Sequence, residues 1–275
     1  MGYLFDPKNW EWITAGSNFK FMLEGFAVNI EIALIAMALS LIFGLALALL
    51  RVSRRPVVKV PAGIWIDVWR NLPLIFIVLY FFLAIPSGVK SAYTDWAPDF
   101  LPEAFQSPAI LAAIIGLTLY NSAVIAEIMR AGIQSLERGQ GEAAAALGLT
   151  DRKAMRLVIL PQALRRMVPA TVSQLITLTK DTSLVSIIGI QELMRHSRIV
   201  TNTSGSPFVG TGVDAPLLQV FIVAGALFAI FNFTLSRLSR RLELRERRIT
   251  GIEVESVTGL EDQVGAEAVL LKKKD

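Results

Sequence analysis

Five blocks of mostly apolar residues, each long enough to cross a lipid bilayer as a helix, constrain the fold of this chain more than any other feature. A helix needs about 20 predominantly apolar residues to cross the hydrocarbon core. In a chain of 275 residues, five such helices leave room only for loops and tails. The sequence therefore predicts an all-α membrane protein without a separate soluble domain. The expected spans are 27–50, 62–85, 109–131, 167–190 and 217–235.

Composition narrows the chemistry that such a chain can perform. Charged residues make up 18% of the sequence, whereas soluble domains contain about 25%. Cysteine is absent, which excludes disulfides, thiol catalysis and cysteine metal sites. His196 is the only histidine, and one imidazole provides neither a metal site nor a catalytic set. We therefore expect no bound metal, no catalytic residue and no enzymatic activity of this chain itself.

The cations are distributed unequally between the connections. Most Lys and Arg residues lie in 51–61, in 132–166 and in the segment after the fifth block, whereas the other connections carry few. Short loops rich in Lys and Arg remain in the cytoplasm. The distribution predicts that the N-terminus is outside, that the C-terminus is inside, and that the loop 132–166 faces the cytoplasm.

The spans and the orientation divide the chain into three segments. Residues 1–25 are mixed and polar, lack the pattern of a signal peptide, and are expected outside the membrane. Residues 26–248 form the transmembrane domain. Residues 249–275 alternate in charge and contain few aromatic side chains, which predicts a disordered cytoplasmic tail. The outer connections 86–107 and 201–214 are expected to be simple links.

The predicted cytoplasmic loop contains helix signals at both ends of a glycine turn. Glu142 opens an Ala-rich helix, where a carboxylate complements the helix dipole, and Gly148 occupies the expected C-cap. Thr150 is the expected N-cap of a second helix that begins at Asp151 and is stopped by Pro161. Small alanine side chains would let another backbone approach closely. From these residues alone, an interfacial helix with snorkelling cations and a docking element for a cytoplasmic partner both remain open.

The same loop resembles the EAA motif of ABC importer permeases. One position departs conservatively, because Val158 stands where the family pattern has Ile. The segments 70–74, 126–133 and 180–185 resemble the branch of that family that transports polar amino acids, and the resemblance covers about residues 20–245. The residues assigned to the coupling loop by this resemblance are Gly141, Glu142, Ala143, Ala144, Gly148, Leu160 and Pro161.

The resemblance implies the five-helix fold of type I ABC importer permeases and a function in import. In that family, the loop between the third and fourth helices of the core inserts into a groove of a separate ATPase subunit. A binding protein delivers the amino acid outside, and two permease subunits, identical or homologous, pair around the pathway. The chain is thus expected to import a polar amino acid of the glutamate, glutamine or basic class across a bacterial inner membrane.

The expected cofactors belong to a partner. The sequence contains no G-x-x-x-x-G-K-[ST] phosphate loop, so another chain must bind the ATP and magnesium that would drive transport. No feature indicates a nucleic-acid partner, whereas contact with membrane lipid follows from the spans. The alternatives are a membrane scaffold that docks a cytoplasmic regulator and an ABC permease for another small solute. A secondary transporter is disfavoured, because no internal repeat is present.

Two adjacent ionisable residues lie near the middle of the fourth block, where charges are costly and indicate function. Lys180 and Asp181 do not face each other on a helix, so each needs a partner elsewhere. A zwitterionic amino acid offers both charges, which places Lys180, Asp181, Thr182 and Ser183 on the candidate substrate path. The alternative is a network that ties helices together, with Glu127 or Arg130 as the partners.

Two further pairs of charges are spaced three residues apart, which allows ion pairs within one helix. These pairs are Asp67 with Arg70 and Glu127 with Arg130, and a packing role is expected for both. Pro73 is expected to kink the second span and to free a carbonyl. Arg70, Pro73, Glu127 and Arg130 are therefore candidates for either structure or pathway.

Polar residues near the outer end of the membrane domain are expected to reach water. Asn29 and Glu31 lie near the outer end of the first block, where snorkelling explains them. His196 falls in an outer connection and is expected to be solvated.

Overall fold

The computed structural model describes residues 5–14, 16–136, 138–202 and 215–250, and these residues form helices and the turns between them. The all-α prediction is confirmed for this part of the chain. Most of the predicted disordered tail, from residue 251 onward, lies outside the described residues. The elements are η1 (Pro7–Ile13), α2 (Asn18–Arg51), α3 (Pro56–Asn71), α4 (Leu74–Ala84), α5 (Ser87–Trp96), α6 (Glu103–Gln106), α7 (Ala109–Gln134), α8 (Arg138–Ala146), α9 (Asp151–Ala154), η2 (Met155–Ile159), α10 (Leu160–Asp181), η3 (Thr182–Ile188), α11 (Leu193–Asn202) and α12 (Leu217–Thr250).

Three of these helices, α2, α7 and α12, are long and apolar enough to cross a membrane. They contain the first, third and fifth expected blocks. The pair α3 and α4 passes the same test only as one broken unit, which is bent by 100°. The helix α10 is not among the candidates, because polar and charged side chains such as Arg165, Gln174 and Lys180 lower its mean hydropathy.

The helix α7 is the centre of the bundle. It packs against α2, α3, α4 and α10, and 67% of its most apolar window is buried, compared with 17% in α12. Small residues let the neighbouring helices approach closely: a Cβ on Gly116 would lie 3.2 Å from the backbone of Val78, and one on Gly44 would lie 2.6 Å from Ile125. Close packing of small residues therefore joins α7 to both α2 and α4.

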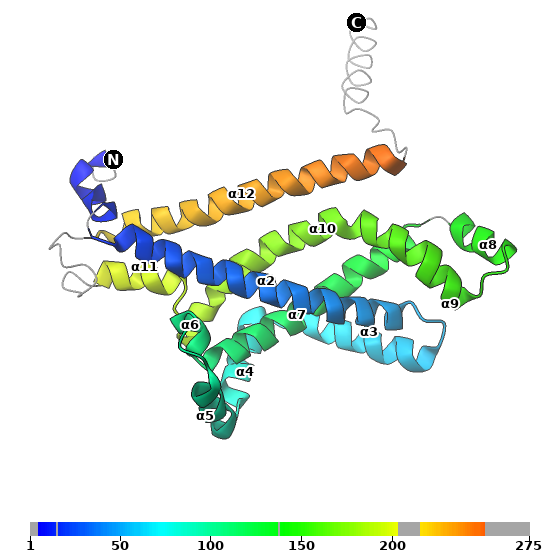
Figure 1. Cartoon of the computed structure of the whole chain (residues 1–275), viewed down its shortest axis with the longest axis horizontal. Helices are drawn as coiled ribbons and strands as arrows, with labels where there is room; N and C mark the ends of the chain where they lie inside the picture. Colours follow the sequence, from blue (N-terminus) through cyan, green and yellow to red (C-terminus); the bar gives the residue numbers. More distant parts are fainter. Residues whose placement is uncertain (1–4, 15, 137, 203–214, 251–275) are drawn as a thin grey trace, which may run out of the picture.

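The long axis of the molecule separates two ends (Figure 1). The helices α8 and α9 lie at one end, beside the turn between α2 and α3, where Arg54 forms an ion pair of 2.8 Å with Asp151. The elements η1 and α11 lie at the opposite end, near the start of α2. The helix α12 packs mainly along α10 and α11.

The second expected span is broken rather than kinked. Leu72 is extended, with φ −83° and ψ 137°, as the residue before a proline tends to be. Pro73 has no N–H to continue the helix, and its carbonyl instead accepts the first hydrogen bond of α4, from Phe76 N at 3.0 Å. The prediction of one kinked helix over residues 62–85 was therefore wrong, because the chain forms two helices and turns through 100° between them.

The connection 86–107 is also more than a simple link, since it folds into α5 and α6. The hydroxyl of Tyr93 donates a hydrogen bond to the carbonyl of Phe105 at 2.6 Å. The amide of Gln106 donates to the carbonyl of Leu101 at 2.8 Å. The first bond joins the two short helices and the second joins α6 to the turn before it, so this connection has a defined shape that its length and prolines did not indicate.

The outer polar residues Asn29 and His196 are buried, and the expectation that they reach water was wrong. His196 stacks on Phe21 with ring centroids 3.8 Å apart. Its Nδ1 lies 2.6 Å from the carbonyl of Phe21, and burial lowers the pKa of the imidazole. Gly25 leaves room for the ring, because a Cβ there would lie 2.7 Å from Nδ1. Glu31, in contrast, is exposed as expected.

Asn29 is the centre of a buried polar layer that joins α2 to the segment between η3 and α11. Its amide nitrogen donates to Thr182 Oγ1 at 3.1 Å and to Glu192 Oε2 at 2.9 Å. Its amide oxygen accepts from the backbone N–H of Leu193 at 3.1 Å. Burial raises the pKa of Glu192, while hydrogen bonds from Asn29 and from backbone N–H groups oppose that shift. One side chain thus satisfies three buried groups from a distant part of the sequence.

We expect the substitution Asn29→Leu to destabilise the protein. Removal of the amide leaves the carboxylate of Glu192 and the N–H of Leu193 buried with fewer partners, and each unsatisfied buried group costs about 1–3 kcal/mol. The control is Asn202→Leu, at the exposed end of α11. Thermal unfolding in detergent should show a midpoint lower by about 5 °C for Asn29→Leu alone. Equal midpoints for both variants would contradict the role of this layer.

Candidate functional site

The loop between α7 and α10 begins with α8, which ends at a glycine-dependent cap. Gly148 has φ +75°, a left-handed conformation that glycine adopts without penalty. Its N–H donates to Ala145 O at 2.9 Å, and the N–H of Leu149 donates to Ala144 O at 3.0 Å. These two bonds form a Schellman motif. The predicted C-cap at Gly148 is confirmed, and it fixes the direction in which the chain leaves α8.

The outer surface of α8 is uncovered in the single chain. Glu142 and Ala143 are exposed, whereas Ala144 is buried against the rest of the loop. Leu147 exposes 81% of its surface at the end of the helix. Small side chains beside one large apolar side chain make a surface against which another protein can pack closely.

Two details of the predicted loop differ from the structure. The helix α8 begins at Arg138, so Glu142 is its fifth residue and lies beyond the first turn, where the helix dipole acts most strongly. Pro161 does not stop the second helix, because the chain continues from α9 through η2 into α10. The N–H of Leu160 bonds to Met155 O across a wider π-helical turn, which accommodates the proline without breaking the helix. Thr150 does occupy the N-cap, although its side chain makes no capping hydrogen bond.

Polar contacts hold this loop against the ends of the long helices. Gln162 Nε2 donates to Gln140 Oε1 at 3.3 Å, which connects α10 to α8. Arg166 Nη1 donates to Ser135 O at 3.0 Å, which connects α10 to the end of α7. These contacts join the loop to both α7 and α10.

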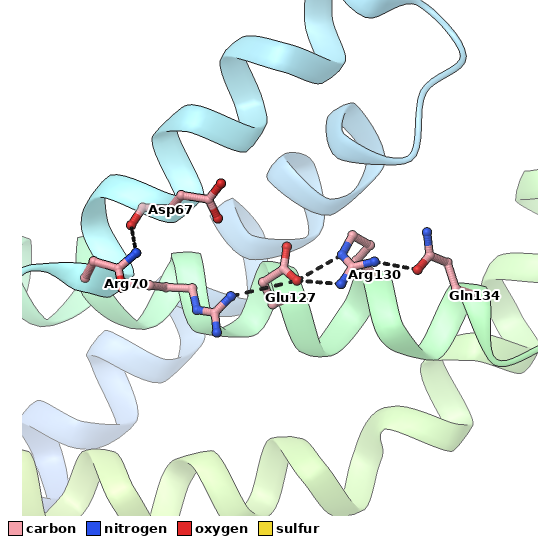
Figure 2. A network of polar contacts seen from close by, with 6 residues as sticks. Asp67, Arg70, Glu127, Arg130 and Gln134 are labelled. Carbon is pink, nitrogen blue, oxygen red and sulfur yellow. Dashed lines mark hydrogen bonds and ion pairs between the residues drawn. The ribbon is translucent and has the colours of Figure 1, made fainter.

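A charged network lies where α3 meets α7 (Figure 2). Glu127 Oε2 accepts hydrogen bonds from Arg130 Nε at 2.9 Å and from Arg130 Nη2 at 2.7 Å, which confirms the predicted pair within α7. Arg70 Nη1 reaches the same oxygen at 3.8 Å from α3. The predicted pair of Asp67 with Arg70 is absent from the described part of the chain, because the Arg70 side chain extends toward Glu127 instead. One carboxylate thus holds two guanidinium groups together.

The residues Lys180, Asp181, Thr182 and Ser183 come together where α10 gives way to η3. Lys180 is exposed and makes no ion pair with any described residue, and Asp181 is half-buried. Ser183 Oγ donates to Lys180 O at 2.8 Å. Neither Glu127 nor Arg130 pairs with this group, since both are engaged with each other. The helix-tying network that they were expected to form with Lys180 and Asp181 is therefore not found among the described residues.

Sequence reasoning missed two polar contacts between helices. Gln174 Nε2 on α10 donates to Asn121 Oδ1 on α7 at 2.8 Å. The carboxylate of Glu192 is the second, as part of the buried layer around Asn29. An amide in the middle of an apolar block, as at Asn121, was the available signal for the first contact. Within the described ranges, no three metal-ligating side chains are grouped closely enough to bind a metal ion.

The sequence of this chain is similar to a known protein family and to several of its members. The family model described as "Binding-protein-dependent transport system inner membrane component" matches residues 40–248. The probable glutamine ABC transporter permease protein GlnP of Bacillus subtilis (strain 168) is 36% identical over 82% of this chain and 94% of its own length. The arginine transport system permease protein ArtQ of the same organism is 30% identical over 81% of this chain and 91% of its own length.

A solved structure agrees with these sequence relatives. The crystal structure of an amino acid ABC transporter with histidines matches with a TM-score of 0.65 and 28% identity. The match covers 82% of this chain and 94% of the solved chain. The helical arrangement and the sequence relatives therefore point to the same group of proteins.

We expect Glu127→Gln to destabilise the junction of α3 and α7, because the two guanidinium groups would lose the carboxylate that they share. The loss is expected to be about 2 kcal/mol, since the carboxylate is only partly exposed. The matched control is Asp67→Asn, which neutralises a nearby exposed carboxylate that makes no ion pair with a described residue. Thermal unfolding in detergent measures both variants. A greater loss in Asp67→Asn than in Glu127→Gln would contradict the assignment of the anion.

Proposed function

The chain belongs to the binding-protein-dependent transport system inner membrane components, as an amino-acid ABC transporter permease, and we propose that it imports a polar amino acid of the glutamate, glutamine or basic class. It would carry out this import with a separate ATPase subunit that binds ATP and magnesium, a second permease subunit and an extracytoplasmic binding protein. The uncovered surface of α8 carries this proposal, because it gives the ATPase a place to act on the permease. A membrane scaffold is not favoured by the relatives.

Coupling to the ATPase is assigned to the loop that contains α8. The motif residues Glu142 and Ala143 lie on its exposed surface, beside the projecting Leu147. Force on this surface would reach the membrane domain through Gln162 and Arg166, whose hydrogen bonds connect the loop to α10 and α7. The full set assigned to coupling is Gly141, Glu142, Ala143, Ala144, Gly148, Leu160 and Pro161.

The substrate path is assigned to the junction of α10 and η3. The support is the exposed ammonium of Lys180, which has no ion-pair partner among the described residues, beside the half-buried carboxylate of Asp181. Ser183 supplies a hydroxyl group at the same place, and Thr182 lines it from the buried layer, where its hydroxyl is held by Asn29 and by the carbonyl of Thr179. A zwitterionic substrate would satisfy these groups while it passes between two permease subunits. Arg70, Pro73, Glu127 and Arg130 act on this path as structural supports, through the break between α3 and α4 and the network on α7.

Five crossings of the inner membrane fit this function. The bent pair α3 and α4 would make the second crossing, and α10 with η3 the fourth, between α7 and α12. The N-terminal residues 1–25 would lie outside, residues 26–248 would form the permease domain, and the tail 249–275 would lie in the cytoplasm. The concentration of Lys and Arg in the connections on the α8 side supports this orientation.

The coupling assignment predicts that Gly148→Val abolishes ATP-driven uptake. A β-branched residue is strained in the left-handed conformation at φ +75°, at a cost of about 1–2 kcal/mol. The chain would then leave α8 in a different direction, which changes the position of its exposed end. Uptake of labelled amino acids into proteoliposomes with the ATPase subunit should fall at least tenfold. The control Gly139→Ala also adds a Cβ in open space, but at a glycine without positive φ, and should transport normally. Normal uptake by Gly148→Val would remove this turn from the mechanism.

The orientation can be tested with single cysteines, because the natural chain contains none. Ser91 and Ser135 are exposed on the two sides of the proposed membrane domain. In intact cells, an impermeant maleimide should label Ser91→Cys, and it should label Ser135→Cys only after permeabilisation. The opposite pattern would invert the topology.

A further inference from the structure

A cavity of about 570 Å³ opens at the end of the molecule opposite α8. Its walls come from the first turns of α2, the start of α6 and the segment that leads into α11. Three carboxylates line it, those of Glu24, Glu31 and Glu103. Two of them lie on α2 and the third lies on α6, so the fold brings together negative charges that are spread over 80 residues of the sequence.

The length of α2 indicates where this cavity lies relative to the membrane. Its 34 residues extend about 51 Å at 1.5 Å per residue, whereas the hydrocarbon core is about 30 Å thick. With Arg51 at the inner boundary, the crossing uses about 20 residues and ends near Glu31. Glu24 then lies above the membrane, in water, on the side from which an imported solute arrives.

The lining of the cavity is rich in hydrogen-bond acceptors. Besides the three carboxylates, the polar side chains of Ser17 and Gln191 line it. His196 directs Nδ1 at the carbonyl of Phe21, which can only accept, so the neutral ring keeps Nε2 as an acceptor. Lys20 is the one cation among the described residues of the lining, and its Nζ lies 3.7 Å from the carboxylate of Glu24. Such a lining suits a ligand rich in donors, and guanidinium has five N–H groups and no acceptor.

The cavity is adjacent to the proposed substrate path. Val28 lines it, and the next residue, Asn29, donates a hydrogen bond to Thr182 at 3.1 Å. Gln191 lines it as well, and the next residue, Glu192, completes the same buried layer. A single layer of side chains therefore separates the cavity from the junction of α10 and η3.

We propose that this cavity binds a basic amino acid, such as arginine or lysine, before it enters the substrate path. The guanidinium or ammonium of the side chain is held by Glu31 and Glu103, and Lys20 is available to the α-carboxylate. The negative field raises the local concentration of cationic amino acids and repels glutamate. The inference rests on the proposed function and deepens it, since it selects the basic class among the polar amino acids.

Binding of radiolabelled L-arginine to the reconstituted transporter complex in lipid nanodiscs, without ATP, tests this site directly. The double variant Glu31→Gln/Glu103→Gln should weaken arginine binding at least tenfold, because two charge-assisted hydrogen bonds lose their anions. The matched control is Asp95→Asn, which neutralises an exposed carboxylate on α5 that does not line the cavity. Unlabelled L-lysine should displace the arginine, and L-glutamate should not.

Two outcomes would overturn the inference. The first is that arginine does not bind, or binds the double variant as well as the wild type. The second is that only stimulation of ATP hydrolysis by the binding protein falls in the double variant, which would mean that the cavity receives a cationic side chain of that protein.

ATP-driven uptake separates this inference from the proposed function. A wild-type transporter that imports glutamine but does not bind arginine refutes only the cavity, whereas one that imports no amino acid refutes the function.

Discussion

Polar groups that are buried in a protein must find their partners inside it, because no water reaches them. Three sets of contacts among the described residues illustrate this requirement. Asn29 joins α2 to Thr182 and Glu192, Gln174 joins α10 to α7 through an amide pair, and Glu127 joins α3 to α7 through two guanidinium groups. Each set connects segments that are remote in sequence, so these polar contacts act together with the close apolar packing in holding the helices side by side.

The central helix α7 takes part in two of the three sets, and it also leads directly into α8. A displacement of α8 would therefore act on the most buried of the three candidate membrane spans. The Schellman cap at Gly148 and the bonds from Gln162 and Arg166 make the loop continuous with the bundle. A close-packed interior transmits such a displacement rather than absorbing it.

The sequence predicted those features that depend on neighbouring residues. The long apolar blocks predicted α2, α7 and α12, glycine at position 148 predicted the cap, and the spacing of Glu127 and Arg130 predicted their pair. It did not predict features that depend on packing between distant segments. The burial of Asn29 requires Glu192, 163 positions away, and the burial of His196 requires Phe21 and the space beside Gly25. Pro161 was misjudged because the chain passes through the π-helical turn Met155–Ile159 and continues into α10, where the proline falls in the first turn.

The groups that the chain leaves unsatisfied are as informative as those it pairs. Leu147 projects from α8, and Lys180 has no ion-pair partner in the described chain. The buried Oε1 of Gln191 lacks a hydrogen bond beside a cavity of carboxylates. The helix α10 leads from the first of these places to the second, and the layer around Asn29 connects the second to the third. A protein that covers Leu147, or an anionic group that reaches Lys180, would supply a contact that the described chain does not make by itself. In the proposed function, these places mark the way from the surface assigned to the ATPase to the outer cavity.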